Sequence, residues 1–177
     1  MTSLAASEVS PEAALVDAAR AGHRDAFDRL YTGYAGMVHG ILMARVPRED
    51  VEDLMQDVFL AAFRKLHMLR DSAAFGPWLA IIARNRAYDY HRRTAEMADL
   101  PEDIPAQGGA DAEASAILAL IQTLPESYRE PLVLRLVEGM TGPEIAQRTG
   151  LTPASVRVNL HRGMKQLREK LRGGHHA

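Results

Sequence analysis

Residues 141–163 read TGPEIAQRTGLTPASVRVNLHRG, and this stretch has the spacing of two helices that cross at a tight turn. Ala146 is small enough for a close helix crossing, and Gly150 follows four residues later, where the turn is expected. Thr152 and Pro153 are suited to begin the second helix, as N-cap and first helical residue. The stretch therefore predicts a helix-turn-helix.

The second helix of this motif carries basic and hydrogen-bonding side chains on its outward side, Arg157, His161, Arg162 and Lys165, with Asn159 nearby. A helix with a basic N-terminal half fits the major groove of DNA. The alternative is a three-helix bundle whose basic residues form an ordinary solvated face. Because spacing, caps and local charge agree, DNA binding is the favoured interpretation.

The charges of the 177-residue chain are unevenly distributed around this motif, although the net charge is only −2. Residues 132–177 hold eight basic and three acidic side chains, a balance of +5. Residues 96–131 hold one basic and eight acidic side chains, a balance of −7, and residues 1–95 hold 12 of each. A near-neutral total therefore does not argue against nucleic-acid binding.

The acidic middle contains a stretch, residues 98–114, that reads ADLPEDIPAQGGADAEA. Its prolines and its Gly-Gly pair raise the cost of ordering, and it has almost no large apolar side chain to pack. We predict a flexible acidic linker over 96–114 between two domains, residues 11–95 and 115–172.

Apolar residues recur at helical spacing in nearly all of the remaining chain, and no stretch alternates long enough to predict a strand. Ser10 and Pro11 suit a helix start, and Gly22 suits a break. The expected helices are two within 13–45, one each near 51–66 and 75–93, and then four near 112–123, 126–138, 142–149 and 153–172. The fold class is all-α, with two small helical domains.

Composition excludes several classes of function. The chain has no cysteine, so disulfides and cysteine-ligated metals are excluded. Its seven histidines are scattered without metal-ligand spacing, and we expect neither a metal nor a cofactor. No apolar run approaches the roughly 18 residues of a membrane span, and no secretory leader is visible. No catalytic constellation is present. We expect a cytoplasmic protein that is not an enzyme.

Two further stretches have a mixed character. Residues 75–93, FGPWLAIIARNRAYDYHRR, combine cations with aromatic rings. This combination is suited to bind nucleic-acid phosphates and unstacked bases. The alternative is that the apolar residues form a core and the arginines an ordinary charged surface. Residues 52–66, EDLMQDVFLAAFRKL, place polar side chains opposite an apolar stripe. That polar side is either a solvated face or a docking surface for another protein.

These stretches stand in the order and spacing typical of one family. Over residues 11–172 the chain resembles bacterial RNA polymerase sigma factors of the extracytoplasmic-function (ECF) group. Besides residues 75–93, the resemblance rests on EDVEDLMQDVFLAAFRKL (49–66), LPESYREPLVLRLVEGMTGPEIAQRTG (124–150) and VRVNLHRGMKQLREKL (156–171). The resemblance implies an alternative sigma factor that binds core RNA polymerase, directs it to promoters and assists promoter opening. Val158-Asn159 departs from the usual Ser/Lys-Arg pair, and Gly163 stands where Ala is common.

The resemblance also implies residue roles. Contacts to the β′ clamp helices of core polymerase fall on Asp53, Gln56, Asp57 and Phe59, with Phe59 expected to support that surface from the core. Contacts to the promoter element near minus ten fall on Ser72, Phe75, Arg84, Asn85, Tyr88, Asp89, Arg92 and Arg93. Contacts to the element near minus thirty-five fall on Thr152, Ser155, Arg157, Val158, Asn159, His161, Arg162 and Lys165.

The resemblance also implies three partners: core RNA polymerase with its β flap, promoter DNA, and an anti-sigma protein. It further implies that the linker threads toward the polymerase active site. The main alternative is a conventional helix-turn-helix regulator with a helical sensing or dimerisation domain. That alternative leaves the cationic stretch 75–93 and the acidic linker without a role. A helical adaptor that binds only proteins does not explain the basic C-terminal piece.

Overall fold

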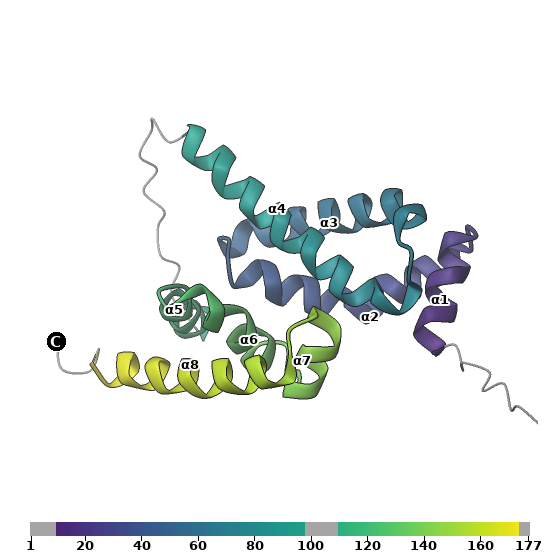
Figure 1. Cartoon of the computed structure of the whole chain (residues 1–177). Helices are drawn as coiled ribbons and strands as arrows, with labels where there is room; N and C mark the ends of the chain where they lie inside the picture. The colour runs from purple at the N-terminus through teal and green to yellow at the C-terminus, as the bar shows by residue number, and fades with distance from the viewer. Residues whose placement is uncertain (1–9, 98–109, 174–177) are drawn as a thin grey trace, which may run out of the picture.

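A computed structural model describes residues 10–97 and 110–173, and these residues form helices and turns without strands (Figure 1). The N-terminal half contains α1 (Pro11–Arg20), α2 (Arg24–Met43), α3 (Val51–Lys65) and α4 (Phe75–Met97). The C-terminal half contains α5 (Ala110–Gln122), α6 (Glu126–Leu136), α7 (Gly142–Thr149) and α8 (Pro153–Gly173). The all-α prediction is confirmed.

The first helices begin and end where the sequence predicts. The Ser10 hydroxyl accepts a hydrogen bond from the Ala13 amide at 3.1 Å, and Pro11 occupies the first helical position. Gly22 adopts φ +94° and separates α1 from α2. The apolar stripe of α3 is buried, with Met55 and Val58 among the core side chains.

Two helices of the C-terminal half form the predicted helix-turn-helix. Thr141 caps α7 through a reciprocal capping box with Glu144. Gly150 ends α7 with φ +77°, a left-handed conformation that favours glycine. Thr152 then accepts a hydrogen bond from the Ser155 amide at 3.1 Å at the start of α8. A small core lies behind the turn, and it consists of Leu134, Met140, Ile145, Ala146 and Val156.

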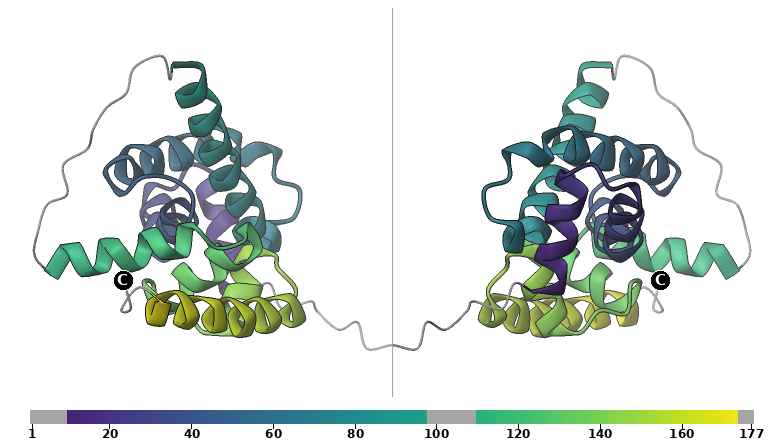
Figure 2. Two further views of the ribbon diagram at one scale, coloured as in Figure 1. Left: turned by 90° about the vertical axis from the view of Figure 1, so that its left-hand side faces the viewer. Right: turned by 90° about the vertical axis from the view of Figure 1, so that its right-hand side faces the viewer.

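The two halves pack against each other over one shared apolar core, which the sequence did not predict. Ile121 of α5, Leu132 of α6 and Leu167 of α8 are buried in the same cluster as side chains of α1 to α4. Figure 2 shows α5 to α8 as a layer beneath the N-terminal helices. Much of the predicted linker 96–114 lies outside the described residues, and helices α4 and α5 extend into its two ends.

Glycines permit the closest contacts between the halves. A Cβ built on Gly40 of α2 would lie 2.5 Å from Cδ2 of the buried Leu134 on α6. A Cβ built on Gly76 of α4 would lie 2.8 Å from the backbone oxygen of Arg148 on α7. Because real Cβ atoms do not approach other atoms this closely, only glycine allows these elements to pack as they do.

Gly76→Ala is expected to destabilise the protein by about 1–3 kcal/mol, because the new methyl group overpacks a contact with backbone. Gly33→Ala is the matched control, since a Cβ on this exposed α2 residue meets nothing within 4 Å. Higher helix propensity predicts that the control is neutral or stabilised by up to about 1 kcal/mol. Urea unfolding followed by circular dichroism measures both, and equal stability of Gly76→Ala and wild type would contradict the packing.

Candidate protein and nucleic-acid interfaces

The outward face of α3 carries the polar residues that sequence reasoning singled out. Asp53, Gln56 and Asp57 are exposed on the side opposite the apolar stripe. Phe59 is only 3% exposed and packs against Tyr31, with ring centroids 4.5 Å apart. Phe59 therefore lies beneath this face, and its part in polymerase binding stays a prediction.

Leu60 extends this α3 face and was missed by the sequence reasoning. Its side chain is 54% exposed although it is large and apolar. Leu60 does not fall at the helical spacing of the buried stripe, which includes Val58, Phe59 and Ala62. This spacing alone could have placed Leu60 on the polar side of the helix. An exposed leucine beside carboxylates is suited to a protein interface.

Most of the predicted minus-ten residues on α4 are exposed. Asn85, Tyr88, Arg92 and Arg93 lie at the surface, and the Tyr88 side chain is 70% exposed. Asp89 forms an ion pair with Arg92 at 3.3 Å. An aromatic ring, an amide and two guanidinium groups along one helix suit stacking on bases and contact with phosphates.

Two predicted minus-ten residues make contacts within the N-terminal half. Phe75 is fully buried and its ring lies 5.0 Å from that of Tyr34, centroid to centroid. The Ser72 hydroxyl donates a hydrogen bond to the Asp17 carboxylate on α1. Both side chains therefore hold the start of α4 in place.

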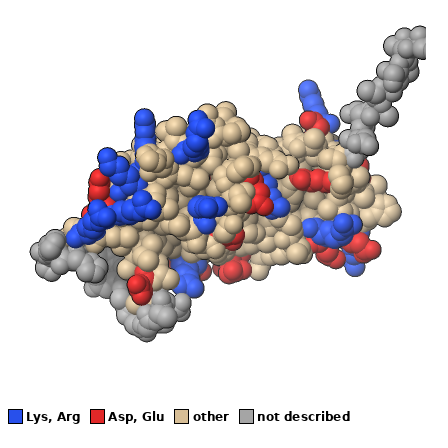
Figure 3. Space-filling model, turned by 90° about the horizontal axis from the view of Figure 1, so that it is seen from below, with Lys and Arg blue, Asp and Glu red and all other residues tan. Residues whose placement is uncertain are grey.

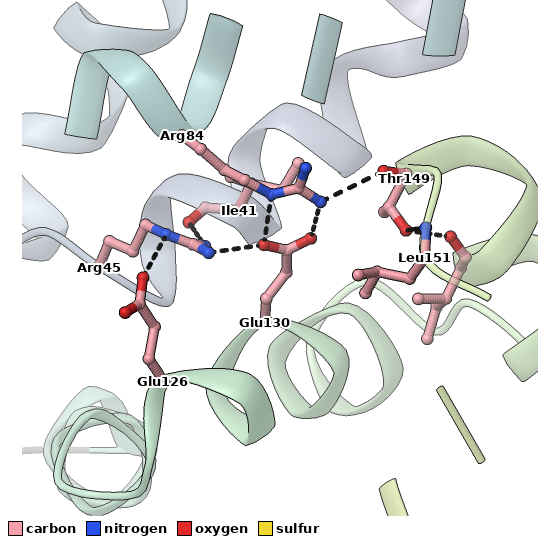
Figure 4. A network of polar contacts seen from close by, with 8 residues as sticks. Ile41, Arg45, Arg84, Glu126, Glu130, Thr149 and Leu151 are labelled. Atoms are coloured by element: carbon pink, nitrogen blue, oxygen red, sulfur yellow. Dashed lines mark hydrogen bonds and ion pairs between the residues drawn. The ribbon is translucent and has the colours of Figure 1, made fainter. Parts of the chain in front are cut away.

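Arg84, another predicted minus-ten residue, turns toward the C-terminal half and binds Glu130 of α6 (Figure 4). Its Nε and Nη2 atoms donate to the two carboxylate oxygens at 3.0 and 2.6 Å, a bidentate pair. Arg45, which follows the end of α2, donates to the same carboxylate at 2.7 Å. Glu130 is only 3% exposed, so its charge is buried between two cations of the other half.

The pKa values of this group follow from these contacts. Burial alone would raise the pKa of the Glu130 carboxyl, but its hydrogen bonds and ion pairs with Arg84 and Arg45 hold it below its ordinary value. Burial alone would lower the pKa of Arg84, and the hydrogen bond and ion pair with Glu130 raise it instead. The Glu130 carboxylate and the Arg84 guanidinium are therefore both charged at neutral pH.

Other polar contacts that join the halves include three made by Gln122, Arg148 and Glu138. The Gln122 side chain on α5 donates to the backbone oxygen of Met43 at 2.9 Å. Arg148 on α7 donates to the backbone oxygen of Gly33 at 2.6 Å and lies over the Tyr34 ring. The third is a contact of the His39 ring on α2 with the Glu138 carboxylate that follows α6.

Sequence reasoning missed these contacts as well as the pairs of Glu130. Their partners lie 46 or more residues apart, and no periodicity or motif relates residues so distant.

The outward face of α8 carries most of the predicted minus-thirty-five residues. Arg157, His161, Arg162 and Lys165 are exposed, and Val158 is 40% exposed beside them. Figure 3, which views the molecule from below, shows Lys and Arg gathered over this part of the surface.

Three predicted residues of α8 have other surroundings. Thr152 and Ser155 are exposed and form the helix cap. Asn159 is half-buried and lines a hollow of about 330 Å3 between the halves, together with Arg84 and Glu130. Asn159, which the sequence placed near the basic face, therefore faces the contact between the halves.

Metal ligands and membrane spans are not found in the described part of the chain. Residues 10–97 and 110–173 contain no group of three or more His, Asp or Glu side chains that could hold a metal ion. None of the helices within these ranges combines the length and apolarity needed to cross a bilayer.

Comparison with known proteins assigns both halves to one family. The family described as Sigma-70 region 2 matches residues 30–96, and Sigma-70, region 4 matches residues 114–167. The chain is 36% identical over 162 residues to RNA polymerase sigma factor CarQ of Myxococcus xanthus. This alignment covers 86% of this chain and 92% of CarQ. It is 29% identical over 185 residues to the ECF RNA polymerase sigma-E factor of Escherichia coli, covering 93% and 96%.

Solved structures give the same fold. The structure of CnrH in complex with the cytosolic domain of CnrY is similar with a TM-score of 0.68 at 25% identity, covering 92% of this chain and 97% of that one. The sigma factor RpoE of Bartonella quintana, solved with the anti-sigma factor NepR, is similar with a TM-score of 0.62 at 20% identity, covering 85% and 98%.

A helix-turn-helix half with a basic reading face, joined to a helical half of sigma region 2, defines a factor for transcription initiation. The chain belongs to the sigma-70 family and, within it, to the ECF group of RNA polymerase sigma factors. It is an alternative sigma factor that directs RNA polymerase to promoters. The region 2 match decides against a conventional regulator with a sensing domain.

Arg157→Ala and Arg162→Ala are each expected to weaken binding to promoter DNA by about 1–3 kcal/mol, because each removes a cation from the exposed α8 face. Binding should also become less salt-dependent. Arg24→Ala, an exposed residue of α2, is the control. Filter binding of holoenzyme to promoter DNA measures the effect, and an unchanged double variant would remove these residues from the interface.

The contact between His39 and Glu138 predicts a pH dependence of stability. Its hydrogen bond with Glu138 raises the pKa of His39 above 6.5, with a further contribution from Glu52 and opposition from burial and Arg48. A raised folded-state pKa adds stability that is fully present below 6.5 and is lost as the pH rises through the raised value.

For this partly exposed pair the expected size is a few tenths to about 1 kcal/mol. His39→Gln should be less stable than wild type at acidic pH and approach it as the pH rises through that window. Urea unfolding at a series of pH values measures the difference, and a constant difference would contradict the assignment.

Proposed function

We propose that this ECF sigma factor uses three separate helix faces. The α3 face binds core RNA polymerase, α4 recognises and helps to open the promoter element near minus ten, and α8 reads the element near minus thirty-five. The observation that carries the proposal is the exposure of polar or basic residues on all three helices, each supported from behind by a buried apolar face. In the domain division that goes with it, residues 11–95 and 115–172 carry these roles, joined by the acidic segment 96–114.

On α3, Asp53, Gln56 and Asp57 bind the β′ clamp helices, and Phe59 fixes the helix against α2. The proposal adds Leu60, whose exposed side chain lies on the same helix face. An apolar contact ringed by polar residues is the usual composition of a stable protein interface. Region 4 is proposed to contact the β flap.

On α4, Asn85 and Tyr88 are proposed to hold unstacked bases while Arg92 and Arg93 bind phosphates. On α8, Arg157 and Arg162 bind DNA, and the exposed Val158 is suited to contact a thymine methyl group. Asn159 requires a rearrangement before it can contact a base, since it faces the hollow between the halves.

We include an anti-sigma protein among the partners. The similar RpoE of Bartonella quintana was solved with the anti-sigma factor NepR, and the similar CnrH was solved with the cytosolic domain of CnrY, which supports this proposal. The chain itself is proposed to be a non-catalytic initiation factor that acts in the cytoplasm, where polymerase and promoters are found.

The test is transcription in vitro with core polymerase and templates whose upstream regions are randomised. Chain plus core should give transcripts that share two upstream sequence elements, while core alone should not. Asp53→Ala combined with Gln56→Ala should weaken core binding by about tenfold or more and leave helicity unchanged. The control is Asp28→Ala, an exposed carboxylate of α2. Absence of specific initiation would refute the proposed function.

A further inference from the structure

A hollow of about 550 Å3 lies between the end of α6 and the C-terminal part of α8, and the proposed function does not use it. We call it the α6–α8 groove; Arg135 and side chains of α8 between residues 160 and 172 line it. We infer that this groove binds an acidic segment of a partner protein, anchored by apolar side chains. All lining residues belong to the C-terminal half, so the site does not depend on how the two halves pack.

Positive charge dominates the α6–α8 groove. Its lining includes the exposed cations Arg135, Lys165, Arg168 and Arg172, against the single carboxylate of Glu169. No carboxylate within residues 10–97 or 112–173 forms an ion pair with any of these four cations. Because several unneutralised charges of one sign surround one hollow, the site attracts an anionic occupant.

The cations of α8 that line the groove share one side of the helix. Lys165, Arg168 and Arg172 follow one another at intervals of three and four residues, which places their side chains on one helix face. The stretch from residue 161 to residue 172 is roughly 16 Å long at 1.5 Å per residue. A short helical segment with carboxylates at the same intervals therefore matches both the length and the charge of the groove.

Apolar side chains in and near the groove favour a protein over a phosphate backbone as the occupant. Leu160 and Met164 line the groove, half-buried where they pack against the apolar core. Leu136 and Val137 directly follow Arg135 in the chain, and they are 46% and 49% exposed. Protein interfaces combine an apolar centre with a polar rim, whereas a phosphate backbone gains little from apolar side chains.

The groove borders the part of α8 that is proposed to read DNA. A recognition helix contacts base edges with its N-terminal residues, and the groove lies along the C-terminal part of α8. His161 and Lys165 line the groove and also belong to the predicted minus-thirty-five residues. An occupant therefore lies directly beside promoter DNA. The three arginines of the groove are not among the predicted DNA contacts, so they can be changed without altering the proposed reading face.

The test measures binding of the full-length chain to a fluorescent helical peptide of about 12 residues, with glutamates on one side and leucines on the other. Wild type should bind this peptide, and glutamine in place of the glutamates should weaken binding about tenfold. Arg135→Ala combined with Arg168→Ala should also weaken binding about tenfold. The matched control combines Arg24→Ala with Lys170→Ala, two exposed cations that do not line the groove, and it should bind like wild type.

A second variant guards against misfolding of the first, which circular dichroism would reveal. Arg168→Ala combined with Arg172→Ala keeps Arg135, which donates to the backbone oxygen of Met140 at 3.3 Å, and it should lose peptide affinity to a similar extent. The inference is overturned if wild type does not bind the peptide, if a folded groove variant binds like wild type, or if the control loses as much affinity as the groove variants.

Promoter binding by holoenzyme distinguishes a partner protein from DNA. Both groove variants should keep wild-type affinity for promoter DNA and wild-type transcription with core polymerase. If they weaken promoter binding and leave peptide binding unchanged, the arginines contact DNA phosphates and the inference is overturned. Transcription by wild type is scored separately, so failure of the peptide to bind leaves the proposed function standing.

Discussion

A carboxylate that is almost completely removed from water must be paired, and the arrangement of the two halves depends on how Glu130 meets this requirement. Its partners both come from the N-terminal half: Arg45 follows α2, and Arg84 lies on α4. The ion pairs therefore exist only while the halves are together. Separation of the halves and hydration of Glu130 are one event, which gives the contact a defined closed state in place of a continuum of loose associations.

The apolar contact between the halves also opposes their separation. Ile121, Leu132 and Leu167 share a core with the N-terminal helices, so separation exposes apolar surface to water. A partner that binds and covers such surface shifts the population toward the open form by its differential affinity for the two forms. Core polymerase is proposed to act in this way through the α3 face, which is exposed while the halves are packed together.

Local features of the fold were predictable from sequence, and contacts between the halves were not. The caps at Ser10 and Thr152 and the turn at Gly150 are set within a few residues, so short-range patterns locate them. Glu130 was counted with the acidic middle of the chain, because nothing nearby in sequence marks its pairing with Arg84. The surroundings of Asn159 were not predictable for a similar reason, since they depend on a half that packs from outside the helix-turn-helix.

The most direct test of the closed state is a distance measurement between the halves by pulsed electron paramagnetic resonance. Because the chain has no cysteine, spin labels at Lys65→Cys on α3 and Lys170→Cys on α8 would be specific. A closed free chain predicts one narrow distance distribution, which shifts to longer distances when core polymerase is added. A broad distribution in the free chain, or no change on binding polymerase, would contradict this account.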